Sequence, residues 1–139
     1  MATLDDVFWK FGYASEAAQL LEVELINVLI EYEMNQGEDI PTLKEKFLKM
    51  DKLTLGRLSN LLREKGLADD ETLQHVASAL SARNYLAHDF YRAHNFAKDT
   101  SAGRQKMLDD LKKTHNIIFE AYRKVLIISG NKIPPLEDD

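Results

Sequence analysis

The chain of 139 residues has no cysteine, three prolines and six glycines. The lack of cysteine excludes a disulfide framework and a thiolate zinc site. Because proline and glycine are scarce, little in the chain interrupts long helices. No apolar run approaches the ~20 residues that a membrane span requires, and the N-terminus lacks the basic flank and apolar core of a signal peptide. These absences predict one cytoplasmic, helix-rich domain with no membrane partner.

The charge balance is acidic, with a formal net charge of −5. Such a charge repels a polyanion at long range and disfavours a protein whose main task is to hold nucleic acid. It leaves room for a local basic site, because five basic residues fall in one part of the chain. These are Arg83, Arg92, Lys98, Arg104 and Lys106.

Hydrophobic periodicity predicts helices over 4–33, 42–50, 54–65, 71–97 and 104–129. Thr3 and Asp6 form a capping-box pattern before the first of them. We therefore expect an all-α antiparallel bundle of about three long and two short helices in residues 1–130. Residues 131–139 are expected to be a flexible acidic tail.

The first helix has apolar residues on two sides. One set follows a heptad through Val7, Ala14, Leu21 and Val28, and the second contains Trp9, Val23, Ile26 and Ile30. A helix that is apolar on two sides needs cover on two sides. We expect either a central position in the bundle or a contact with a second copy of the chain.

The fourth predicted helix changes character along its length. An apolar stripe of Leu73, Val76, Ala77 and Leu80 continues at helical spacing into Asn84, His88, Tyr91 and Asn95. A second apolar stripe runs through Leu86, Phe90, Ala93 and Ala97. Each half-buried polar group must find a hydrogen-bond partner or cost roughly 1–3 kcal/mol. The polar row is therefore either a structural network or a functional site.

Arg83 and His88 are five positions apart, which places them about 140° apart around an ideal helix. They cannot easily reach one small ligand from a single straight helix. We expect that the helix bends or ends here, or that two copies of the chain pool these residues at a two-fold axis.

The segment from Ala79 to Tyr91 resembles the HEPN superfamily, the higher eukaryotes and prokaryotes nucleotide-binding domains. The signature of that family is an Arg, four to six residues and a His, commonly with a polar residue directly after the Arg. Arg83, Asn84 and His88 match it. Many HEPN proteins are dimeric, metal-independent endoribonucleases, often the toxin of a toxin–antitoxin or phage-defence system.

The resemblance implies a role for each matching residue. His88 is expected to act as general acid or base when a ribose 2′-hydroxyl attacks the adjacent phosphodiester. Arg83 is expected to hold the phosphate with its planar fork of donors, and Asn84 to orient the histidine or the phosphate. Tyr91 and Arg92 are weaker candidates for substrate contacts. RNA is then the substrate, a second copy and an antitoxin protein are the partners, and no cofactor or metal is needed.

Other interpretations remain open. The same residues are compatible with a non-catalytic interaction or regulatory bundle, or with a nucleotide-binding module that does not cleave. His115 lies in an apolar stripe and is expected to be a hydrogen-bonded core residue. His75 is expected at the surface, and His94 lies near the motif but outside it. No metal-ligand set with single-face spacing is present, so we predict no metal site.

Overall fold

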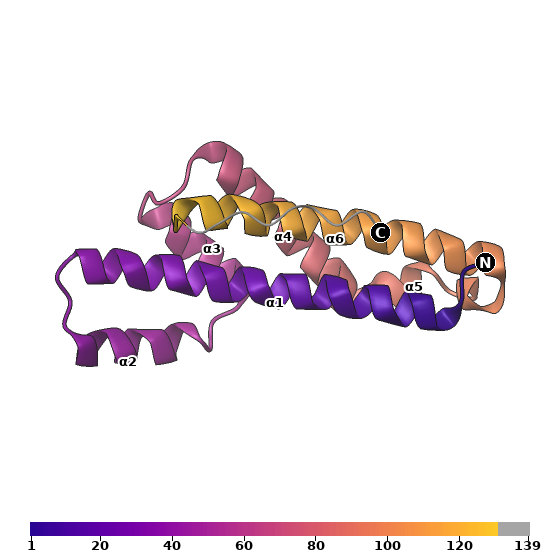
Figure 1. Cartoon of the computed structure of the whole chain (residues 1–139), viewed down its shortest axis with the longest axis horizontal. Coiled ribbons are helices and arrows are strands. Elements are labelled where there is room, and N and C mark those ends of the chain that lie inside the picture. Colours follow the sequence, from indigo (N-terminus) through magenta and orange to yellow (C-terminus); the bar gives the residue numbers. More distant parts are fainter. Residues whose placement is uncertain (131–139) are drawn as a thin grey trace.

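The computed structural model describes residues 1–130, and this part of the chain contains helices and no strands (Figure 1). The predicted all-α bundle is thus confirmed, while the predicted tail at 131–139 lies outside the described residues. The elements are α1 (Leu4–Asn35), α2 (Ile40–Met50), α3 (Leu55–Glu64), α4 (Asp70–His88), α5 (Phe90–Ala93), the 3₁₀ helix η1 (Ala97–Asp99) and α6 (Ser101–Ile128).

The start of α1 is the predicted capping box. Thr3 Oγ1 accepts a hydrogen bond from the Asp6 N–H at 3.1 Å, and the Asp6 carboxylate accepts one from the Thr3 N–H at 2.9 Å. The heptad stripe of α1 is buried at Val7, Ala14, Leu21 and Val28. Capping and burial therefore place the longest helix of the chain as the sequence predicts.

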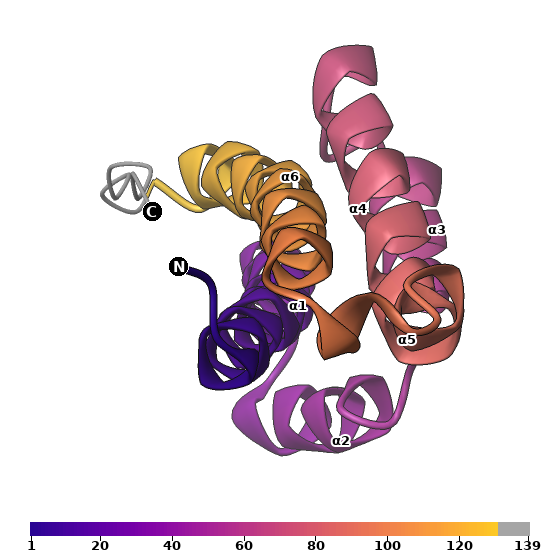
Figure 2. The same cartoon turned by 90° about the vertical axis from the view of Figure 1, so that its right-hand side faces the viewer.

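α1 packs most extensively against α6, and the two helices run parallel (Figure 2). Arg104 Nε donates to the Ala2 carbonyl at 2.9 Å near both helix starts, and Lys10 Nζ lies 2.9 Å from His115 Nδ1 further along. His115 is buried, which confirms it as a hydrogen-bonded core residue. α4 runs antiparallel to α6, since Glu71 pairs with Lys124 at 3.1 Å near one end.

The second predicted apolar set of α1 is covered only in part. Ile26 is buried, whereas Trp9 is 68% and Val23 is 52% exposed. A central position in the bundle is therefore wrong for this side of the helix. Within residues 1–130, the other helices cover Trp9 and Val23 only in part.

The C-terminal end of α1 is joined to α2 and α3 through one carboxylate. Glu33 accepts hydrogen bonds from Lys46 on α2 at 3.0 Å and lies 3.1 Å from Lys65 Nζ at the end of α3. The side chain of Glu33 is 11% exposed. These two lysines lower the pKa of the Glu33 carboxyl.

We predict that Glu33→Gln lowers the melting temperature at pH 7 by a few degrees, because paired lysines typically contribute up to about 1 kcal/mol each. A carboxyl whose pKa is lowered in the folded state stabilises the fold at pH values above its unfolded pKa of 4.5. This stabilisation is lost as the pH falls through the lowered pKa. Thermal unfolding followed by circular dichroism should therefore show a larger difference at pH 7 than at pH 3. An equal difference at both pH values would contradict the ion-pair explanation.

The fourth helix is shorter than predicted, because α4 ends at His88 and not near residue 97. At Asp89 the backbone leaves helical geometry, and the chain turns to bury Phe90 completely. α5 and η1 then lead into α6. The end of α4 lies after His88, so Arg83 and His88 remain on one continuous helix and the helix end does not bring them together.

The connection between η1 and α6 is closely packed. A Cβ atom on Gly103 would lie 2.0 Å from the Ala97 carbonyl oxygen. Arg104, one residue later, also donates through Nη1 to the Lys98 carbonyl at 2.8 Å. Arg104 therefore helps to hold this connection in place.

Candidate functional site

The buried face of α4 is rotated from the predicted one. Ala77 is exposed, and Leu73 and Leu80 are half-buried. The buried residues are Thr72, Val76, Ala79, Ala82 and Leu86. Asn84 and His88 are consequently exposed rather than half-buried, which corrects the prediction that this row lies against the core. In the second stripe, Leu86 and Phe90 are buried, whereas Ala93 is exposed.

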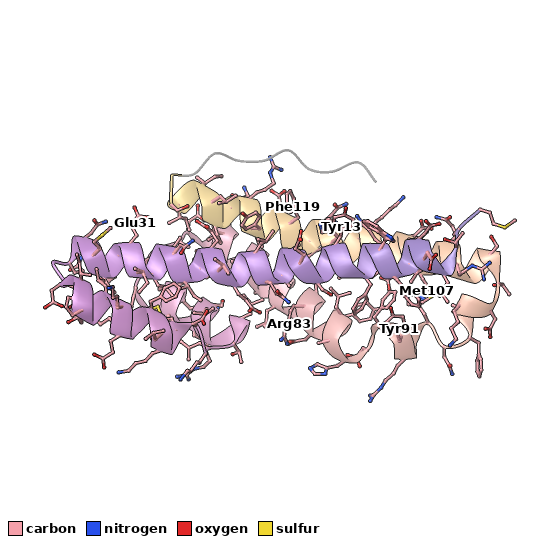
Figure 3. The ribbon with its side chains drawn as sticks, turned by 60° about the horizontal axis from the view of Figure 1, so that its bottom comes forward. Tyr13, Glu31, Arg83, Tyr91, Met107 and Phe119 are labelled. Carbon is pink, nitrogen blue, oxygen red and sulfur yellow. The ribbon has the colours of Figure 1, made fainter. Side chains whose placement is uncertain are left out.

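Arg83 lies in a groove between α1 and α4 that has a volume of about 490 Å³. From α1, the groove is lined by Ser15, Gln19 and Glu22 among others, and from α4 by Arg83, Leu86 and Ala87. Figure 3 shows Arg83 beside α1, on the same side of that helix as Tyr91. A groove of this size can hold one nucleotide unit.

The groove contains opposite charges. Burial raises the pKa of the Glu22 carboxyl above its usual value, and the positive charge of Arg83 opposes part of this rise. Arg83 Nη1 also donates a hydrogen bond to Asn84 Oδ1 at 3.3 Å. Asn84 therefore contacts the guanidinium of Arg83, which is neither of its two predicted roles, and Glu22 is a nearby carboxyl group that the sequence did not indicate.

His88 is the last residue of α4 and is exposed. The lining of the groove ends at Ala87, so His88 does not share the groove with Arg83. Within one chain, the fold brings Arg83 and Asn84 together and leaves His88 apart from them. The about 140° separation expected from helical geometry accounts for this arrangement.

Tyr91 and Arg92 lie on α5, directly after the motif. The Tyr91 ring packs on Phe11 of α1, with centroids 5.2 Å apart, and on Phe90 at 5.0 Å. Burial raises the pKa of the Tyr91 hydroxyl, although the residue remains 47% exposed. Arg92 is exposed. These two residues therefore present an aromatic edge and a cation on the surface next to His88.

A second polar cluster lies beside the motif, and sequence reasoning missed it. Asp110 on α6 accepts hydrogen bonds through Oδ2 from the Tyr85 hydroxyl and from His94 Nε2, the latter at 2.6 Å. Burial and the carboxylate of Asp110 raise the pKa of Tyr85, so its hydroxyl stays protonated as a donor. The residues are 25 and 16 positions apart, so no local spacing signals the cluster.

No family model, curated protein or solved structure matches this chain. Within residues 1–130, no group of three or more histidine, aspartate or glutamate side chains is arranged to hold a metal ion. No helix in this part of the chain is long and apolar enough to cross a membrane.

Proposed function

We propose that this protein is a metal-independent endoribonuclease of the HEPN type. The observation that carries the proposal is the Arg83–Asn84 pair in a groove of α4, on the same helix that ends at an exposed His88. The guanidinium of Arg83 is the group that binds the phosphodiester, and His88 transfers a proton. By the same resemblance, the protein acts as the toxin of a toxin–antitoxin or phage-defence system, with an antitoxin protein as partner.

The chemistry needs no metal. The ribose 2′-oxygen forms a bond to phosphorus while the bond from phosphorus to the 5′-oxygen breaks, giving a 2′,3′-cyclic phosphate and a 5′-hydroxyl. A base removes the proton of the 2′-hydroxyl, and an acid supplies a proton to the 5′-oxygen. The planar fork of Arg83 offsets the negative charge that develops on the phosphoryl oxygens.

The proposed enzyme is a homodimer in which Arg83 and His88 come from different copies, because one chain holds them apart. Support for a second copy comes from the uncovered face of α1, which has exposed Phe8, Trp9, Tyr13 and Val23. Gly12 lies in the middle of this face with nothing within 4 Å of a Cβ. Glycine in an exposed helix is destabilising by roughly 0.5–1 kcal/mol relative to alanine, whereas close approach of another helix favours it. Val23 also lines the Arg83 groove, so this face adjoins the proposed site.

We predict that Trp9→Glu converts the dimer to a monomer at micromolar concentration, because a buried charge on this face lacks a partner. Sedimentation velocity would measure the change. Ile40→Glu is the matched control: Ile40 is also 68% exposed but lies on α2. A wild-type protein that is monomeric at all concentrations would contradict the two-copy site.

The experiment that tests the function is cleavage of a panel of RNAs by the purified protein in EDTA. We expect cleavage to persist and the products to carry 2′,3′-cyclic phosphate and 5′-hydroxyl ends. No cleavage by a folded dimer would overturn the proposal. Saturable nucleotide binding without cleavage would instead indicate a binding module. Loss of folding or of dimerisation in His88→Ala would indicate a structural role for the motif.

A further inference from the structure

His94 is held in one orientation by two groups from different parts of the fold. Its Nε2 lies 2.6 Å from Asp110 Oδ2 on α6, and its ring packs on Phe90 with centroids 4.8 Å apart. The side chain is 16% exposed. An imidazole fixed in this way is restrained in a manner typical of positioned acid–base groups.

The hydrogen bonds also determine which nitrogen of His94 carries the proton. Asp110 Oδ2 accepts from the Tyr85 hydroxyl as well as from His94, and an ionised carboxylate can only accept. His94 Nε2 is therefore the donor, and the lone pair of the neutral ring lies on Nδ1. When the ring is charged, both nitrogens carry protons and Asp110 is its counter-ion.

The other nitrogen of His94, Nδ1, is not fully buried. Nδ1 makes no hydrogen bond within residues 1–130. It is also not a buried atom without a partner, because in that part of the chain the buried side-chain atom of this kind is Arg123 Nε. The fold therefore directs one ring nitrogen to Asp110 and leaves the other accessible to a ligand.

His94 lies next to the end of the motif helix. Tyr85 is three positions before His88, so their side chains are neighbours on α4, and Tyr85 meets His94 through Asp110. The turn that follows is closed by a bond from the Ala93 N–H to the Asp89 carbonyl at 2.8 Å. Exposed Arg92 belongs to the same turn.

We propose that His94 is the second proton-transfer group of the ribonuclease site, with Asp110 and Tyr85 as its positioning residues. This inference rests on the proposed function. His88 takes the proton of the 2′-hydroxyl, the 2′-oxygen bonds to phosphorus, and the bond to the 5′-oxygen breaks. His94 gives its Nδ1 proton to that 5′-oxygen, so the two histidines end with their protonation states exchanged and the step is balanced.

The test compares the full-length wild type with His94→Gln on two substrates. One is an RNA that the wild type cleaves, and the other has sulfur in place of the 5′-oxygen at the cleaved linkage. We expect His94→Gln to lower kcat on the first by ~10²–10⁴ and to abolish the alkaline limb of its pH profile. On the sulfur substrate, His94→Gln should have a kcat close to that of the wild type, since a thiolate leaves without protonation.

Matched variants separate a catalytic role from a structural one. Asp110→Asn should lower kcat by roughly 10–100-fold and move the alkaline limb, as expected of a group that orients a reacting histidine. His75→Gln, a half-exposed histidine on α4 away from the cluster, should cleave like the wild type. Circular dichroism and the melting temperature verify that each variant is folded.

Three results would overturn the proposal. The first is a His94→Gln variant that cleaves RNA as fast as the wild type, or that loses the same share of activity on both substrates. This result would leave the proposed function intact. The second is a nitrogen NMR spectrum of the wild type in which neutral His94 carries its proton on Nδ1; this measurement decides the question even if His94→Gln fails to fold. The third is a wild type that cleaves no RNA, which would remove both proposals together.

Discussion

Alanine in place of His88 should lower the rate of RNA cleavage in EDTA by ~10²–10⁴, the usual contribution of a positioned general acid or base. His88 is exposed at the end of α4, so its removal leaves no cavity in the core and should not change the melting temperature. The expected result is therefore loss of kcat in a protein with wild-type helicity and wild-type sedimentation.

A second substitution in the motif tests whether Arg83 and His88 act together from different copies of the chain. Arg83→Lys keeps the positive charge but removes the planar fork of donors, so we expect a loss in kcat with the dimer retained. Mixing Arg83→Lys with His88→Ala should restore part of the activity, because mixed dimers contain one intact composite site. Absence of any recovery in subunit-exchanged mixtures would contradict a site shared between copies.

Gly103→Ala should produce the largest loss of stability, about 3 kcal/mol, and lower the melting temperature by about 10 °C. The added Cβ would lie 2.0 Å from the Ala97 carbonyl oxygen and 2.7 Å from its carbonyl carbon. Both are backbone atoms, so no side-chain rotation can relieve the overlap, and η1 must move away from α6. Thermal and urea unfolding would measure the change.

Gly56→Ala is the matched control for this prediction. A Cβ on Gly56 would meet a Leu80 side-chain carbon at 3.7 Å, an ordinary van der Waals contact. We expect stability within about 1 kcal/mol of the wild type, because alanine also favours the helix. Equal melting temperatures for Gly103→Ala and the wild type would show that the η1–α6 connection can shift without cost.

Much of the fold was predictable because local rules determine it. The capping box at Thr3 and Asp6 and the heptad of α1 are short-range patterns, and both appear as predicted. The end of α4 was not predictable in the same way, since an apolar stripe continues at helical spacing through Phe90, Ala93 and Ala97. Phe90 leaves the helix to fill a core position, and such a position is set by tertiary packing.

The candidate site was predictable only in part. The sequence places Arg83 and Asn84 on one helix next to one another, and their hydrogen bond follows from that. Glu22 and Asp110 come from helices far away in the chain, so their contacts depend on how α1 and α6 pack. The rotation of the buried face of α4 was missed because Ala77 and Ala79 are equally apolar, and their types do not indicate which one faces the core.

The parallel packing of α1 on α6 has a consequence for how the chain folds. About 65 residues separate the end of α1 from the start of α6, and this connection must be ordered before the largest interface of the molecule can form. Contacts between segments so distant in sequence slow folding, in contrast to bundles made of successive helical hairpins. During synthesis, the part of the apolar stripe of α1 that packs on α6 therefore stays uncovered until α6 has left the ribosome, although α2, α3 and α4 can already pack on α1.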